Sequence, residues 1–180
     1  MDNTTLKQQA LTFIKGRNNL LAVIILTVVN IILTAFDAGL NFLFSATIPQ
    51  FVYEIGKSFD LELGTNIFMK IGLVMAFIII VTYFVFWLLS KRIRGFILAA
   101  LIFFSIDSVV LLSLILIVDF EVSYLLEIAF HGWILFYLIN GTRAWYKLRG
   151  INTNDFNVIL QEIKTNQTGI KELSTPDKID

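Results

Sequence analysis

The chain has 180 residues, of which 57% are hydrophobic and only 16% are charged, and its mean hydropathy is +0.78. A soluble domain usually carries about 25% charged residues, and a chain of this size cannot bury so much apolar surface. This composition excludes a soluble globular enzyme and a disordered chain. The 14 Lys and Arg residues are balanced by 14 Asp and Glu, which leaves no basic surface for nucleic acid, and the absence of Cys excludes disulfides and thiol chemistry.

Residues 1–18 are predicted to form a cytoplasmic amphipathic segment. Leu6, Ala10 and Phe13 recur at helical spacing, with polar residues on the opposite side. The segment is either a short helix lying on the membrane surface or a helical lead-in to the apolar run that follows. That run is longer than the core of a secretory signal and no Ala-x-Ala site follows it, so we expect no cleavage.

Four apolar runs are long enough to cross about 30 Å of hydrocarbon as helices, which takes roughly 20 residues each. The sequence lacks the alternating apolar and polar segments that form the strands of a membrane β-barrel. The predicted fold is therefore an all-α membrane protein with a four-transmembrane-helix bundle. The transmembrane domain covers residues 19–142, with spans over about 20–44, 67–90, 95–118 and 122–140.

The loop of residues 45–66 is predicted to contain an amphipathic helix at the outer end of the bundle, either interfacial or re-entrant. Pro49 suits a first helical turn, and Phe51 and Ile55 fall on one face while Glu54 falls on the other. One interpretation is a connector that rests on the membrane. The other is a lid or a surface for a partner.

Residues 143–180 are predicted to form a polar cytoplasmic tail. A short helix is expected over about 153–164, with Phe156 and Ile159 on its apolar side. Beyond Thr165 the composition is typical of a disordered chain.

Basic residues predict the orientation. Twelve of the 14 Lys and Arg residues precede the first span, lie between the second and third spans, or follow the fourth span. Because Lys and Arg accumulate in cytoplasmic loops, both termini are predicted to be cytoplasmic and the loop of residues 45–66 to be external.

Ionisable side chains inside apolar spans are costly and mark candidate sites. Asp107 and His131 lie at the midpoints of the third and fourth spans, so the two side chains are expected to meet at equal depth. Glu127 lies one helical turn before His131 on the same face. The predicted intramembrane polar cluster contains Asp37, Lys70, Asp107, Glu127 and His131.

Two interpretations of this cluster stay open. It is either a proton-linked or ion-binding site, or a packing network that fixes how the helices associate. Glu127 and His131 share a helix face, but one His and no Cys make a poor metal set, and no Gly-x-Ser-x-Gly elbow accompanies Ser105 or Ser108. We therefore expect no catalytic residue, no cofactor and no metal.

Three stretches together resemble a known group of proteins. They are residues 42–49 (FLFSATIP), residues 107–112 (DSVVLL) and residues 130–141 (FHGWILFYLING). They are similar to an uncharacterised family of small four-helix integral membrane proteins of Firmicutes. The likeness covers about residues 18–150 and implies this architecture and a bacterial plasma membrane, and it brings no activity, ligand or partner.

Size, short loops and the lack of a catalytic motif favour a non-enzymatic accessory or scaffold subunit, in contact with the lipid bilayer and a partner membrane protein. The alternative is a small proton-linked transporter or channel. Four helices are few for a transport path in a monomer, so this alternative predicts a homo-oligomer. A third possibility, an intramembrane enzyme using Glu127 and His131 as acid and base, is the least supported because no catalytic motif accompanies them.

Overall fold

The computed structural model describes residues 2–36, 44–117 and 122–173, and within these ranges the chain is helical with no strand. α1, α3, α4 and α5 are long and apolar enough to cross a membrane. The protein is therefore a multi-pass helical membrane protein. The helices, in chain order, are α1 (Asn3–Ala35), α2 (Thr47–Leu63), α3 (Phe68–Leu89), α4 (Phe96–Ile115), α5 (Val122–Lys147) and α6 (Thr153–Leu173).

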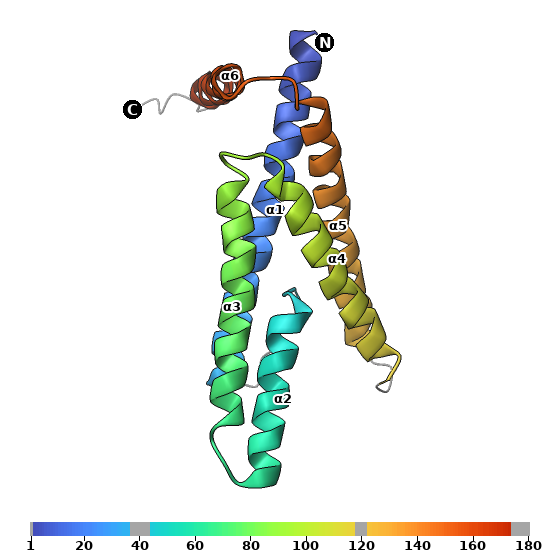
Figure 1. The fold of residues 1–180 in the computed structure, drawn as a ribbon. Helices are drawn as coiled ribbons and strands as arrows, with labels where there is room; N and C mark the ends of the chain where they lie inside the picture. Colours follow the sequence, from blue (N-terminus) through green and yellow to red (C-terminus); the bar gives the residue numbers. More distant parts are fainter. Residues whose placement is uncertain (1, 37–43, 118–121, 174–180) are drawn as a thin grey trace, which may run out of the picture.

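The helices form an elongated bundle (Figure 1). α1 packs along α5, α4 packs on α5, and α2 forms a hairpin with α3. The turn of this hairpin lies farther along the bundle than the neighbouring ends of α4 and α5, while α6 lies across the opposite end, beside the N-terminal part of α1. Among the described residues, the α2–α3 hairpin thus extends farthest at its end of the bundle.

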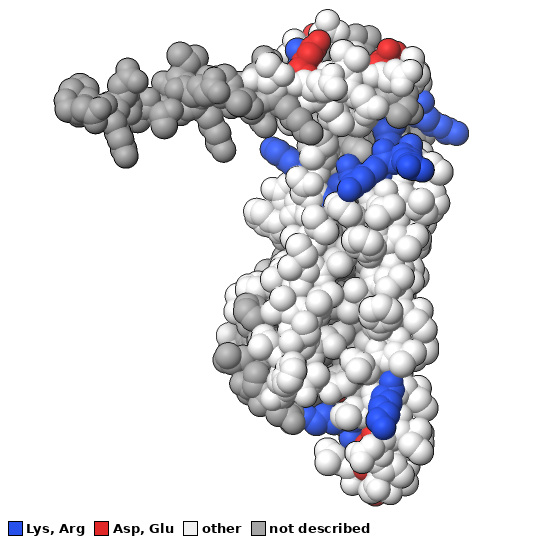
Figure 2. Space-filling model, turned by 90° about the vertical axis from the view of Figure 1, so that its left-hand side faces the viewer, with Lys and Arg blue, Asp and Glu red and all other residues white. Residues whose placement is uncertain are grey.

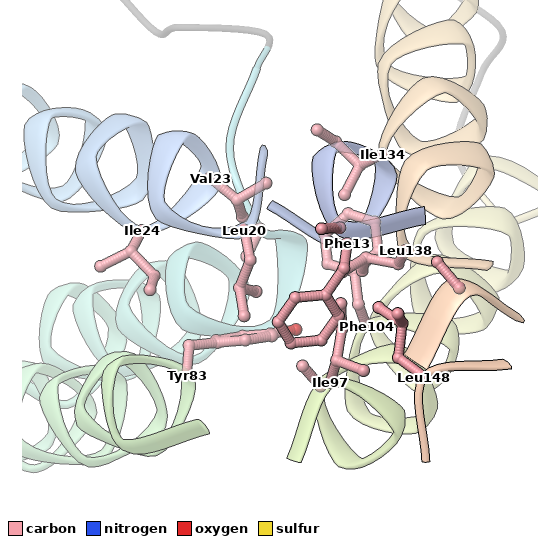
Figure 3. Close-up of a cluster of buried hydrophobic side chains, with 14 of the residues drawn as sticks. Phe13, Leu20, Val23, Ile24, Tyr83, Ile97, Phe104, Ile134, Leu138 and Leu148 are labelled. Carbon is pink, nitrogen blue, oxygen red and sulfur yellow. The ribbon is translucent and has the colours of Figure 1, made fainter. Parts of the chain in front are cut away.

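The core is a column of side chains between α1, α3, α4 and α5 (Figure 3). The outer surfaces of the same helices remain apolar: Phe77 is 65% exposed, Val109 is 62% exposed and Phe136 is 61% exposed. Such an apolar surface is suited to contact with lipid. The helices also meet the second requirement of lipid, that backbone N–H and C=O groups find hydrogen-bond partners within the protein. The labelled core residues are Phe13, Leu20, Val23 and Ile24 of α1, Tyr83 of α3, Ile97 and Phe104 of α4, Ile134 and Leu138 of α5, and Leu148.

Glycines bring two helix pairs into close contact. A Cβ on Gly72 of α3 would lie 2.7 Å from the carbonyl oxygen of Val52 in α2. A Cβ on Gly16 of α1 would lie 3.2 Å from the Cα of Gly141 in α5. Backbones that approach this closely gain van der Waals contact, which is the main source of helix association in lipid.

The structure decides between the two interpretations of the N-terminal segment and ends the first helix earlier than predicted. α1 is continuous from Asn3, so the N-terminal segment is a lead-in to the first span and not a separate surface helix. α1 also ends at Ala35 and not at residue 44, and the N–H of Ala46 hydrogen-bonds to Oγ1 of Thr27, two turns before the end of the helix. Residues 37–43 of the predicted span lie outside the described residues.

The other differences concern helix length. α5 continues to Lys147, seven residues past the predicted span, because Ala144 is buried against the core. α6 continues to Leu173, so residues 166–173 are helical where a disordered chain was expected. Helical hydrogen bonding depends on local backbone geometry and does not stop where hydropathy falls.

Candidate functional site

The N-terminus of α2 lies inside the bundle, beside the middle of α4 (Figure 1). The residues that lead into it are enclosed, since Ala46 is fully buried and Ser45 is 7% exposed. Non-helical backbone at membrane depth is stable only where its polar groups have partners within the protein. The side chains that supply these partners form the candidate site.

Asp107 of α4 binds the first two residues of α2. Its Oδ2 accepts a hydrogen bond from the backbone N–H of Thr47 at 2.9 Å, and its Oδ1 accepts one from Ile48 at 2.8 Å. The first N–H groups of a helix have no partner in their own helix, and the helix dipole favours a negative charge there. The fully buried carboxylate of Asp107 therefore caps a helix that begins 60 residues earlier in the chain.

His131 of α5 lies beside this cap. Its Nε2 is 3.9 Å from Oδ2 of Asp107, 3.3 Å from the carbonyl oxygen of Ser45 and 3.4 Å from Oγ1 of Thr47. Its Nδ1 is 3.0 Å from Oγ of Ser108, and the ring stacks on Phe104 with 4.9 Å between ring centroids. The expected proximity of Asp107 and His131 is confirmed, and both also contact the start of α2.

The imidazole of His131 can take two protonation states in this place. In the neutral ring, Nε2–H donates to Ser45 and Nδ1 accepts the hydroxyl proton of Ser108. In the imidazolium, Nδ1–H donates to Ser108, whose hydroxyl donates at 2.9 Å to the carbonyl of Phe104. The two states therefore differ by one proton on Nδ1 and by the direction of the Ser108 hydroxyl, which turns from Nδ1 to the carbonyl of Phe104.

α1 contributes the other wall of the site. Oγ1 of Thr27 accepts a 2.9 Å hydrogen bond from the N–H of Ala46 and donates to the carbonyl of Val23. Nδ2 of Asn30 donates to Oγ of Ser45 at 3.0 Å and also to Oε1 of Gln50. Sequence reasoning did not assign Thr27 to the site, although Thr27 and Asn30 are polar, three residues apart and on one face of an apolar helix.

Two further members of the predicted cluster, Lys70 and Glu127, make no described contact with Asp107. Lys70 is exposed on α3, where it lines a shallow hollow with apolar neighbours. Glu127 is half-buried one turn from His131, close enough to Glu54 of α2 for the two carboxylates to repel each other. Asp37 lies outside the described residues.

A second buried carboxylate, which sequence reasoning missed, fixes the other end of α2. Oδ1 of Asp60 accepts hydrogen bonds from Oγ1 of Thr65 at 2.6 Å and from the N–H of Phe68 at 3.0 Å, and Oδ2 accepts the N–H of Met69 at 2.8 Å. Burial by itself raises the pKa of Asp60, but these hydrogen bonds outweigh it and hold the pKa below its ordinary value. Gly64 ends α2 in the left-handed region, at φ +64°.

The site contains no candidate metal centre within the described ranges, where no three His, Asp or Glu side chains gather. Its chemistry is that of a buried carboxylate, a titratable imidazole and hydroxyl groups around a helix N-terminus. Comparisons with protein-family models, with curated proteins and with solved structures find no match to this chain. The resemblance to the Firmicutes family therefore stays a prediction.

Proposed function

We propose that the protein is a non-enzymatic accessory or scaffold subunit of a bacterial plasma membrane, with both termini in the cytoplasm, that presents the α2–α3 hairpin to a partner membrane protein. The distribution of basic residues supports this orientation. On the face seen in Figure 2, Lys and Arg side chains gather near the end where α6 lies, and a smaller group lies toward the opposite end.

The observation that carries the proposal is the fixing of the hairpin at both ends by buried aspartates. Asp107 binds the start of α2, and Asp60 joins the end of α2 to the start of α3. Both oxygens of each carboxylate accept hydrogen bonds within the chain. Such an arrangement suits a rigid structural element better than a site that must exchange a ligand.

The turn of the hairpin exposes large apolar side chains. Leu61 is 78% exposed, Leu63 is 58% exposed and Ile67 is 61% exposed, at the point where the hairpin extends past α4 and α5 (Figure 1). A group of exposed apolar side chains on a rigid element is typical of an interaction surface. The partner that fits this surface is a membrane protein with an apolar segment at the outer membrane interface.

Native mass spectrometry of the protein, extracted in mild detergent from its own host, tests the proposal. The wild type is expected to be recovered with a second chain of different mass, and the double variant Leu61→Gln, Leu63→Gln is expected to lose it. The matched control is Leu116→Gln, Ile117→Gln, because these side chains are 87% and 82% exposed at the end of α4, outside the hairpin. Recovery of the wild type without any second chain would contradict the proposal.

A second candidate function is proton-linked transport by a homo-oligomer, and the two hydrogen-bonding states of His131 favour it. A histidine whose two ring nitrogens have hydrogen-bond partners both before and after it takes up a proton from outside the site suits a proton relay. The test is proton flux into liposomes that contain the purified protein. Flux that falls in Asp107→Asn while the folded protein persists would favour transport, whereas no flux above that of empty liposomes would exclude it.

A further inference from the structure

The end of the bundle opposite the hairpin turn holds a cluster of two cations around one indole ring. The ammonium of Lys91 lies 4.0 Å from the centroid of the Trp87 ring, and the guanidinium carbon of Arg17 lies 5.8 Å from it. Nε of Arg17 donates a 2.8 Å hydrogen bond to Oγ of Ser90, which donates in turn to the carbonyl of Trp87 at 2.6 Å. α1 and the end of α3 therefore hold the two positive charges beside the same ring.

No described carboxylate lies within ion-pair distance of Arg17 or Lys91. Glu162 of α6 pairs with Lys7 of α1 at 2.9 Å and not with Arg17 or Lys91. The indole N–H of Trp87 is also buried without an acceptor among the described residues. The cluster thus contains donors and positive charge but no anion.

The nearby basic residues differ in their surroundings. Arg94 is committed to the carbonyl groups of Leu148 and Ile151. Arg92 is exposed, and no described contact ties it to the ring of Trp87. The fold therefore brings together Arg17 and Lys91. The terminal N–H groups of these two side chains have no acceptor among the described residues.

We propose that Arg17, Trp87 and Lys91 form a binding site for a phosphate group, supplied by an anionic phospholipid headgroup or by soluble phosphate. A guanidinium fork and an ammonium are the groups that proteins use to bind phosphate. The cluster lies at the end of α3, a helix long and apolar enough to cross a membrane, and the polar headgroups of a bilayer border its hydrocarbon core. Basic pockets between transmembrane helices bind anionic headgroups in this way.

Lipid titration of the delipidated full-length protein in detergent, followed by native mass spectrometry, tests the site. Phosphatidylglycerol is the probe, phosphatidylcholine is the zwitterionic control, and inorganic phosphate is added as a competitor. We expect one phosphatidylglycerol to bind more tightly than any phosphatidylcholine. Competition by millimolar inorganic phosphate would assign the site to phosphate of either source, and lack of competition would assign it to the lipid headgroup.

Three single variants locate the binding. Lys91→Gln and Arg17→Gln are each expected to weaken phosphatidylglycerol binding about fivefold, while Arg92→Gln removes a charge from the same turn without effect. Lys91 is exposed, so its loss leaves the fold intact even if Arg17→Gln disturbs the contact with Ser90. The proposal is overturned if Lys91→Gln binds like the wild type, or if the protein shows no preference for phosphatidylglycerol.

Discussion

The carboxylate of Asp107 accepts a 2.8 Å hydrogen bond from the backbone N–H of Ile48, so that the middle of α4 holds the first turn of α2. The two residues are 59 positions apart in the chain. This contact holds the N-terminus of α2 in the interior of the bundle, while the other end of α2 extends past α4 and α5 (Figure 1).

Asp107→Asn is expected to destabilise the protein by about 2–4 kcal/mol. The Asn side chain keeps one acceptor oxygen, but its NH₂ group faces an N–H of α2, so one buried donor loses its partner. Thermal unfolding in detergent, followed by circular dichroism, measures the change. Ser105→Ala is the control on the same helix, because it removes only a hydrogen bond to Leu101 and is expected to change stability by less than about 0.5 kcal/mol.

Wild-type stability in Asp107→Asn would show that the cap does not hold α2. If an activity such as proton flux disappeared in that stable variant, Asp107 would be a functional proton site and the second candidate function would be preferred.

Asp60 is expected to make stability dependent on pH at the acidic end of the range. Its pKa is lower in the folded chain than the value of about 3.9 for an unfolded Asp. A carboxyl of this kind stabilises the fold fully above its unfolded pKa, and the contribution is lost as the pH falls through the folded pKa. We therefore expect the loss to occur below about pH 4.

Unfolding midpoints of wild type and Asp60→Asn, compared between neutral pH and about pH 3, measure this effect. The wild type should approach the variant as the pH falls. Glu62→Gln is the control, since Glu62 is exposed two residues away in the same turn. A constant difference between wild type and Asp60→Asn across the whole range would rule out this role for Asp60.

Gly72→Ala is expected to separate α2 from α3 and to destabilise the protein by about 1–3 kcal/mol. The added Cβ would lie 2.7 Å from the carbonyl oxygen of Val52 and 3.2 Å from the Cα of Tyr53, and neither backbone atom can move independently. Gly132→Ala is the matched control, because nothing lies within 4 Å of its Cβ position and Ala is the better helix former. In chemical or thermal unfolding, Gly132→Ala should be as stable as the wild type or more stable, and Gly72→Ala less stable. Equal stability of the two variants would contradict the close packing of α2 on α3.

Arg94→Ala is expected to release α6 from the bundle. The guanidinium of Arg94 donates to the carbonyl of Leu148 at 3.2 Å and to that of Ile151, and it lies 4.8 Å from the ring of Phe156. Burial lowers the pKa of Arg94, although a guanidinium keeps its proton at any pH of interest.

Trypsin cleavage after Arg149, in the connection between α5 and α6, measures this release. Cleavage should be several-fold faster in Arg94→Ala than in the wild type, because the connection must open to enter a protease. Arg92→Ala removes a basic residue from the same turn and should cleave at the wild-type rate. Equal rates in both variants would show that Arg94 does not hold α6.

Local composition was sufficient to predict the membrane class and the four apolar helices. Hydropathy sums over neighbouring residues, so α3 and α4 begin and end within three residues of their predicted limits. The meeting of Asp107 and His131 was also predictable, because both lie at the midpoints of apolar runs and an isolated polar group at that depth needs a partner.

Only the tertiary structure decided which groups the buried carboxylates of Asp107 and Asp60 bind. The main partners of Asp107 and Asp60 are backbone N–H groups, which every residue except Pro carries and which therefore leave no mark in the side-chain pattern. The early end of α1 could not be predicted from hydropathy, because residues 36–44 are as apolar as a helix in lipid. Hydrogen bonds between Thr27 and Ala46 and between Asn30 and Ser45 place Ala46 and Ser45 inside the bundle. Hydropathy reports where a chain can lie, whereas the direction in which it turns depends on contacts between residues that are distant in the sequence.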